Sequence, residues 1–228
     1  MFEYLFLDLD DTILDFHKAE RIAIAKTIRE FGVEPTEAVI SRYHVINKWH
    51  WEQLELGKMA RAEVLENRFA MLFSELGTEV DKTACARSYE RHLAQGHWFL
   101  PGAEEAVEAL SKKYRLFLAS NGTASVQKGR MTSANLSRFF ERSFVSQELG
   151  HNKPSRAYFE AAFAQIPGFN REKCLMVGDS LTSDVKGGIN AGIKTCWVNP
   201  THASGREDIR PDYEIEYLSQ LEGLLEAL

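Results

Sequence analysis

Two aspartates, Asp8 and Asp10, follow a short apolar run near the start of the chain and are separated by one residue. If that run is a β-strand, its period of two places both carboxylates on the same side of the chain as it leaves the sheet. Adjacent carboxylates repel each other, so the pair is costly unless a cation lies between them. With Mg²⁺ present, one carboxylate can be a nucleophile while the other transfers protons. Taken alone, such a pair is more often a solvated acidic turn.

Polar residues also follow two later apolar runs. Ser120 and Asn121 close the run YRLFLAS, where a hydroxyl and free backbone amides at a helix start suit a phosphate oxygen. A simple helix N-cap would explain the same residues. Lys153 precedes Pro154, and a proline can begin a helix, so the ammonium group would lie just outside the first turn. There it could neutralise a phosphoryl group and an attacking carboxylate.

A fourth group of polar residues follows the run KCLMV. It consists of Gly178 and Asp179, with Asp184 five residues after Asp179. Carboxylate oxygens are the ligands that Mg²⁺ prefers. Each of the four groups is weak evidence alone, but the carboxyl ends of parallel strands meet at one edge of a sheet, where ligands bind. Together they predict one crevice for a divalent cation and a phosphoryl group.

The elements that would position these residues form an α/β fold, a Rossmann-like parallel sheet with helices on both faces. Apolar runs predict strands at 3–9, 114–120, 143–146, 173–177, 194–198 and 213–215. Residues 15–96 contain hardly any strand signal, and their apolar residues recur at helical spacing, so they are expected to form a separate bundle of about four helices. The expected domains are therefore an α/β core, residues 1–14 plus 97–228, and an inserted helical domain, residues 15–96.

The composition excludes several classes of protein. The 228 residues are 44% hydrophobic and 26% charged, with a net charge of −6, which does not suggest a surface for nucleic-acid polymers. No apolar run approaches the roughly 20 residues that span a bilayer, and the start of the chain lacks the basic region of a signal peptide. The three cysteines, Cys85, Cys174 and Cys196, are widely spaced. We expect a cytoplasmic protein with reduced cysteines and no membrane partner.

These residues resemble the motifs of a known family. Four motifs are similar to those of the haloacid dehalogenase-like (HAD) hydrolase superfamily. They are Asp8 to Thr12, Ser120, Lys153, and Gly178-Asp179 with Asp184. The resemblance covers essentially the whole chain and implies a helical cap domain inserted in the core. Within the superfamily, the stretches Asp10–Thr12, Trp51–Gly57 and Gly187–Gly192 look most like the bacterial pyrimidine 5'-nucleotidase branch.

The resemblance implies a magnesium-dependent phosphomonoester hydrolase that forms an aspartyl-phosphate. Asp8 would attack phosphorus, and Asp10 would protonate the leaving alkoxide and then activate water. The ligands implied for Mg²⁺ are Asp8, Asp10 (through its backbone carbonyl) and Asp179. The groups implied for the phosphoryl oxygens are Ser120, Asn121 (through its amide) and Lys153, with Asp184 and Thr12 in support. Asp11 stands where many relatives have glycine, and we interpret it as structural.

The implied partner is a small phosphorylated metabolite, with a nucleoside monophosphate as the first choice. In the helical insertion, Trp49, His50 and Trp51 point about 100° apart and cannot share one narrow buried stripe. At least one of these rings is therefore available for a base, although bundle packing is the more common reason for a tryptophan in such a helix. The protein is expected to be a monomer, with a dimer as the alternative.

One other function stays open, and two further functions are disfavoured by the residues present. A sugar-phosphate or other small-metabolite phosphatase would use the same core, because the core does not contact the leaving group. A haloacid dehalogenase needs the nucleophile but no acid for the leaving group, so Asp10 argues against it. A catalytically dead binding module would lack Asp8, Asp10, Lys153 or Asp179, and all four are present.

Overall fold

The computed structural model describes all 228 residues, which divide into two compact units. The α/β unit comprises Met1–Asp15 and His97–Leu228, and the helical unit is Phe16–Gly96. The parallel sheet and flanking helices of the first unit confirm the predicted α/β fold class. No helix in either unit combines the length and the apolar composition that a bilayer span requires.

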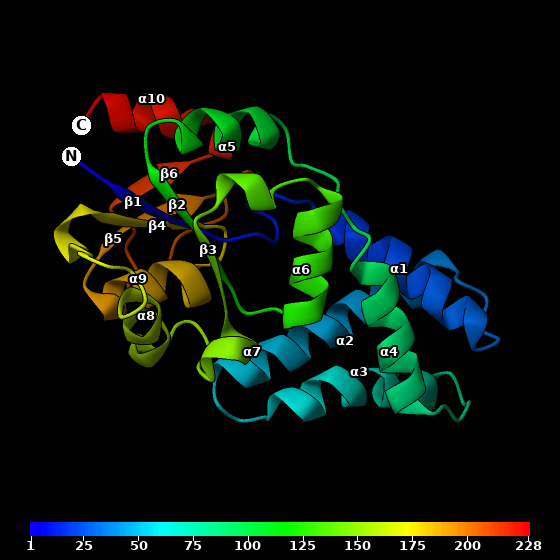
Figure 1. Cartoon of the computed structure of the whole chain (residues 1–228). Helices are drawn as coiled ribbons and strands as arrows, with labels where there is room; N and C mark the ends of the chain where they lie inside the picture. The colour runs from blue at the N-terminus through cyan, green and yellow to red at the C-terminus, as the bar shows by residue number, and fades with distance from the viewer. The chain divides into compact units, whose positions relative to one another are not determined.

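Six parallel strands form the sheet, in the order β3-β2-β1-β4-β5-β6 (Figure 1). Their bounds are β1 Tyr4–Leu7, β2 Arg115–Ser120, β3 Arg142–Val145, β4 Cys174–Gly178, β5 Lys194–Val198 and β6 Tyr213–Ile215. All six lie where the apolar runs predict them. The first strand lies in the middle of the sheet, with Leu7 paired to Leu118 of β2 on one side and to Val177 of β4 on the other. The residues that follow these three strands therefore leave the same edge of the sheet.

Six helices belong to this unit: α5 Ala103–Ser111, α6 Ala124–Ser133, α7 Ser146–Leu149, α8 Arg156–Phe163, α9 Lys186–Ala191 and α10 Leu221–Glu226. Short 3₁₀ turns lie at Ser137–Phe139, Arg171–Lys173 and Leu218–Gln220, and a π-helical turn at Leu181–Val185. The short helix α7 has no counterpart among the predicted elements. The prediction that Pro154 begins a helix is wrong, because the hydroxyl of Ser155 accepts a bond from the Ala157 amide and caps α8 there instead.

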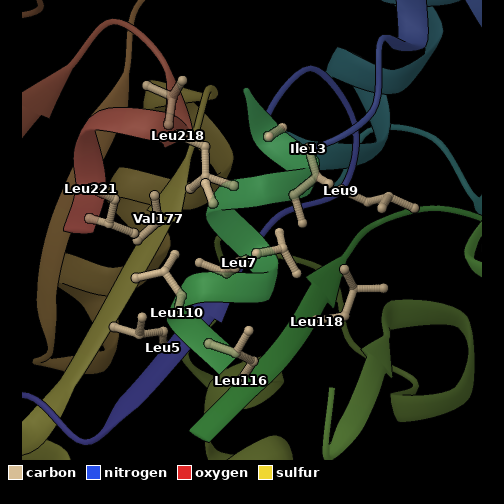
Figure 2. Close-up of a cluster of buried hydrophobic side chains, with 14 of the residues drawn as sticks. Leu5, Leu7, Leu9, Ile13, Leu110, Leu116, Leu118, Val177, Leu218 and Leu221 are labelled. Atoms are coloured by element: carbon tan, nitrogen blue, oxygen red, sulfur yellow. The ribbon is translucent and has the colours of Figure 1, made fainter. Parts of the chain in front are cut away.

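The two faces of the sheet bury different side chains. Along β1, Leu5 and Leu7 face one layer while Tyr4 and Phe6 face the other, as the period of two requires. The first layer is aliphatic and packs against α5 and α10, whose Leu110 and Leu221 point toward the strand leucines in Figure 2. The second layer is aromatic and packs against α8 and α9. Because each buried leucine contributes about 1.5–3 kcal/mol, the central strands are firmly held.

The helical unit contains α1 Phe16–Glu30, α2 Glu37–Glu55, α3 Arg61–Glu75 and α4 Lys82–Leu93, in agreement with the helical spacing. Its core includes the rings of Tyr43, Phe69 and Tyr89, whose centroids lie 5.4–5.5 Å apart. In α2, Trp49 is 43% exposed whereas His50 is buried. Trp51 is half-buried and donates its indole hydrogen to Asn47. As expected, the three consecutive side chains do not share one buried stripe.

Candidate active site

The residues after β1 form a tight loop. The Asp8 amide donates to the Val177 carbonyl at 2.9 Å, which extends the β1–β4 ladder by one bond. The Leu9 carbonyl then accepts from the amides of both Ile13 and Leu14, and the Asp11 amide donates to Leu14. This fold keeps Asp8 and Asp10 at the carboxyl end of the central strand, the position at which open parallel sheets bind ligands.

Asp11 adopts a left-handed backbone conformation, with φ of +53°. Side chains other than glycine rarely adopt it, although aspartate and asparagine tolerate it better than most. This explains why glycine is suitable at this position and supports the structural interpretation of Asp11.

A buried ammonium group connects the first and last motifs. The Nζ atom of Lys153 donates to Asp8 Oδ1 at 2.8 Å, to Asp184 Oδ1 at 2.6 Å and to the Ala119 carbonyl at 2.7 Å. All three hydrogens of the ammonium group are therefore used. Since only one oxygen of Asp8 is engaged by Lys153, its second oxygen is left for chemistry.

Burial sets the electrostatics of this cluster. It raises the pKa of Asp8 to about 8, with Asp184 and Asp10 adding to the rise and Lys153 opposing it. Burial, followed by the charges of Asp184 and Asp8, also raises the pKa of Asp179 well above its ordinary value. For Lys153, burial alone would lower the pKa, but the carboxylates of Asp184 and Asp8 outweigh it and raise the pKa. The cluster therefore has more negative charge than one lysine can balance.

The backbone of Lys153 is fixed by Asn121. The side-chain amide of Asn121 donates to the Lys153 carbonyl at 2.9 Å, and its oxygen accepts from the Lys153 amide at 2.8 Å. It also donates to Ser183 Oγ at 3.2 Å. The sequence pointed to the backbone amide of Asn121 as a phosphate ligand. In the structure, its side chain also joins the segment after β2 to the lysine.

The backbone of Asp179 is held from two sides. Its amide donates to Thr12 Oγ1 at 3.0 Å, and its carbonyl accepts from the indole of Trp197 at 2.7 Å. The preceding residue, Gly178, has no room for a side chain, because an added Cβ would overlap the carboxylate of Asp184. The glycine of this motif therefore allows Asp184 to reach Lys153.

Three carboxylates could hold a metal ion together. Oxygens of Asp8, Asp179 and Asp184 lie within 4.8 Å of one another. Hard oxygen donors with a net negative charge fit Mg²⁺. Two of the three are ligands that the family resemblance implies, and the third, Asp184, also accepts from Lys153. The residues present therefore fit a divalent cation.

The second aspartate of the first motif faces a different group. Oδ2 of Asp10 accepts from Gln127 Nε2 at 2.7 Å, and its Oδ1 forms an ion pair with Arg130. The same Gln127 nitrogen lies 2.7 Å from Ser120 Oγ, which also accepts from the Gly122 amide. Ser120 and Asp10 are thus joined by one side chain of α6.

Sequence reasoning missed Gln127 and Arg130. Both are buried, and they lie three residues apart, so they share one face of α6. The other face of this helix carries the exposed Ser125 and Lys128. A polar pair three residues apart on the opposite face is the signal that could have identified them. Trp197 was missed as well, because nothing local in the run KTCWV indicates the bond that it makes to Asp179.

Known proteins similar to this chain agree on the family. Residues 2–192 match the family model of the haloacid dehalogenase-like hydrolases. The pyrimidine 5'-nucleotidase PynA of Streptococcus pneumoniae is 40% identical, over 94% of this chain and 91% of its own length. The pyrimidine 5'-nucleotidase YjjG of Escherichia coli is 29% identical, over 98% of this chain and 97% of its own.

A solved structure gives the same result for the fold. The YfnB protein of Bacillus subtilis superposes on this chain with a TM-score of 0.94 and 38% identity, over 98% of both chains. The crystal structure of YfnB is bound to magnesium and reveals interdomain movement. The family match covers most of the chain, including all four motifs. This chain therefore belongs to the haloacid dehalogenase-like hydrolase family.

Proposed function

We propose that the protein is a Mg²⁺-dependent phosphomonoester hydrolase that acts on nucleoside 5'-monophosphates through an aspartyl-phosphate on Asp8. The observation that carries this proposal is the contrast between the two aspartates. Asp8 is buried against Lys153, whereas Asp10 is partly exposed and hydrogen-bonded at both oxygens. This contrast supports a role for Asp8 as the nucleophile and for Asp10 as the proton carrier.

In the first step, the free oxygen of Asp8 forms a bond to phosphorus, the bond to the leaving oxygen breaks, and Asp10 donates a proton to that oxygen. In the second step, water attacks phosphorus, the bond to Asp8 breaks, and Asp10 takes the proton from water. Lys153 balances charge beside Asp8 throughout, and the Ser120 hydroxyl binds a phosphoryl oxygen. Mg²⁺ held by Asp8, Asp179 and Asp184 would neutralise negative charge on the carboxylates and the phosphoryl group.

The nucleotide assignment is supported by the two pyrimidine 5'-nucleotidases among the relatives. A proton donor at Asp10 also suits the poor alkoxide leaving group of a nucleotide, in contrast to the halide that a dehalogenase releases.

The three cysteines are buried and unpaired, which supports a reducing compartment such as the cytoplasm.

A panel of substrates tests the proposal. The protein is incubated with Mg²⁺ and one substrate at a time, and release of phosphate or halide is measured. The substrates are pyrimidine and purine nucleoside monophosphates, sugar phosphates and a haloacid. Pyrimidine nucleotides are expected to give the highest kcat/KM, and Asp8→Asn to abolish it. Preference for sugar phosphates would replace the nucleotide assignment, and halide release would overturn the phosphatase assignment.

A further inference from the structure

Gln127 contacts two groups of the candidate site at once. Its Nε2 atom lies 2.7 Å from Ser120 Oγ and 2.7 Å from Asp10 Oδ2. An amide nitrogen has two hydrogens in a fixed planar geometry, so each hydrogen is used in one of these bonds. The side chain is buried.

The side-chain amide of Gln127 must point its NH₂ group, and not its oxygen, toward Asp10. Turning the amide over would bring its oxygen against the carboxylate of Asp10, where two acceptors would face each other. In the observed orientation the Oε1 atom is buried and accepts no hydrogen bond. A buried acceptor without a partner reduces stability, and in native structures such a group calls for an explanation, which can be catalytic.

These contacts determine where the Ser120 hydroxyl hydrogen points. A hydroxyl oxygen has two acceptor positions and one hydrogen. Ser120 Oγ accepts from Gln127 Nε2 and, at 3.1 Å, from the Gly122 amide, so both acceptor positions are filled. Its hydrogen is therefore left to donate to an incoming oxygen. Gly122 permits the arrangement, because an added Cβ would lie 2.5 Å from Gln127 Nε2.

Asp10 is fixed in a similar way. Gln127 holds one of its oxygens, and the guanidinium of the buried Arg130 holds the other. A carboxylate bonded through both oxygens cannot rotate freely, so its direction relative to Ser120 is set by α6. Proton transfer depends on such positioning, because the donor must lie within hydrogen-bond reach of the reacting oxygen.

We propose that Gln127 is a positioning residue that directs the Ser120 hydroxyl hydrogen toward a phosphoryl oxygen and, with Arg130, fixes the carboxylate of Asp10. The assignment rests on the proposed phosphatase function. It separates into two effects. Loss of the bond to Ser120 weakens phosphate binding for every substrate. Loss of the bond to Asp10 slows the first chemical step only for those substrates whose leaving group needs a proton.

The test compares Gln127→Leu with wild type on two substrates, the best nucleoside monophosphate of the panel and 2,4-dinitrophenyl phosphate. The dinitrophenolate ion is stable and needs no proton when it leaves. For the nucleotide, the first-turnover release of the nucleoside is expected to slow roughly 100-fold, in the range of general acid–base effects, whereas the first-turnover release of dinitrophenolate slows less than about fivefold. KM is expected to rise about tenfold for both substrates, as for the loss of one hydrogen bond to a charged group.

The Ser120 effect has its own test, a double-mutant cycle. Ser120→Ala should raise KM to a similar extent, and adding Gln127→Leu should raise it no further, because both changes weaken the same hydrogen bond from Ser120 to the phosphoryl oxygen. The matched control is Lys128→Met, on the exposed side of the same helix, which should leave all constants unchanged. Thermal unfolding of each variant checks the fold, and Gln127→Met replaces the leucine variant if that variant unfolds.

The outcomes separate the two levels of the proposal. A wild-type protein inactive on every phosphate would overturn the proposed function. With an active wild type, a Gln127→Leu variant that matches Lys128→Met on both substrates would overturn the positioning role. If Gln127→Leu slowed the first turnover of both substrates equally, Gln127 would not position Asp10. If the KM changes of Gln127→Leu and Ser120→Ala were additive, Gln127 would not act through Ser120.

Discussion

The Nζ atom of Lys153 lies 2.8 Å from Oδ1 of Asp8, and both groups are buried. The pair leaves one oxygen of Asp8 available, and the same lysine also binds Asp184 at 2.6 Å. A single positive charge thus holds two carboxylates that would otherwise repel each other. The same lysine therefore contributes both to the stability of the α/β unit and to the position of the Asp8 carboxylate.

Lys153→Met should therefore destabilise the metal-free protein strongly. Breaking a buried ion pair from one side leaves an unbalanced charge and costs about 3–5 kcal/mol in the free energy of unfolding. Urea unfolding in EDTA measures the effect. Adding Asp184→Asn should recover part of the stability but none of the activity, since it removes a carboxylate and restores no lysine. Stability equal to wild type in Lys153→Met would show that the pair contributes nothing.

Gly178→Ala should reduce activity, because the new Cβ overlaps the carboxylate of Asp184 and displaces it from Lys153. A displacement of about 1 Å at a catalytic group can cost roughly 100-fold in kcat. The matched control is Gly223→Ala in α10, where a Cβ meets no atom within 4 Å. That change should stabilise the helix by about 0.5–1 kcal/mol and leave kcat unaltered. Similar kinetics for both variants would refute the close-approach explanation.

Asp11 offers a test of backbone conformation beside the site. Because its φ is +53°, Asp11→Gly should change the free energy of unfolding by less than about 1 kcal/mol. Asp11→Val, with a branched side chain in the left-handed region, should destabilise by about 2 kcal/mol or more. Chemical denaturation of both variants gives the comparison. If valine were tolerated as well as glycine, the left-handed conformation would not be a constraint at this position.

Metal removal should affect both activity and stability. EDTA is expected to abolish phosphate release, and Mg²⁺ to restore it. Because binding to the folded state alone stabilises it, Mg²⁺ at about 100 times its Kd should add about 2.7 kcal/mol and raise Tm. Asp179→Asn should lose most of this rise in Tm, a readout independent of turnover. Full activity in EDTA together with an unchanged Tm would exclude the metal site.

The strands and the motifs at their ends could be predicted because both depend on local patterns. Short apolar runs bounded by polar residues predict buried parallel strands, and parallel strands bring their carboxyl ends to one edge. That reasoning alone placed Asp8, Ser120 and Asp179 at one edge of the sheet. The left-handed conformation of Asp11 was harder to predict, since aspartate is common in several kinds of turn.

The contacts made by side chains from neighbouring elements could not be predicted. Gln127 and Arg130 reach Asp10 across more than a hundred residues of sequence, and a helix pattern shows only which face is buried, not which partner it meets. The same holds for the bond from Trp197 to Asp179. The start of α8 was misplaced because the capping strength of Ser155 outweighs the preference of Pro154 for a first helical turn.

In the proposed mechanism, Asp8 carries the phosphoryl group during the reaction. Asp10→Asn, mixed with 2,4-dinitrophenyl phosphate and Mg²⁺, should form the phosphoenzyme at once and hydrolyse it slowly, because the base that activates water is missing. Acid quenching within the first turnover, followed by peptide mass spectrometry, should locate one phosphoryl group on Asp8. A phosphoryl group on another residue, or none at any time during dinitrophenolate release, would contradict the account.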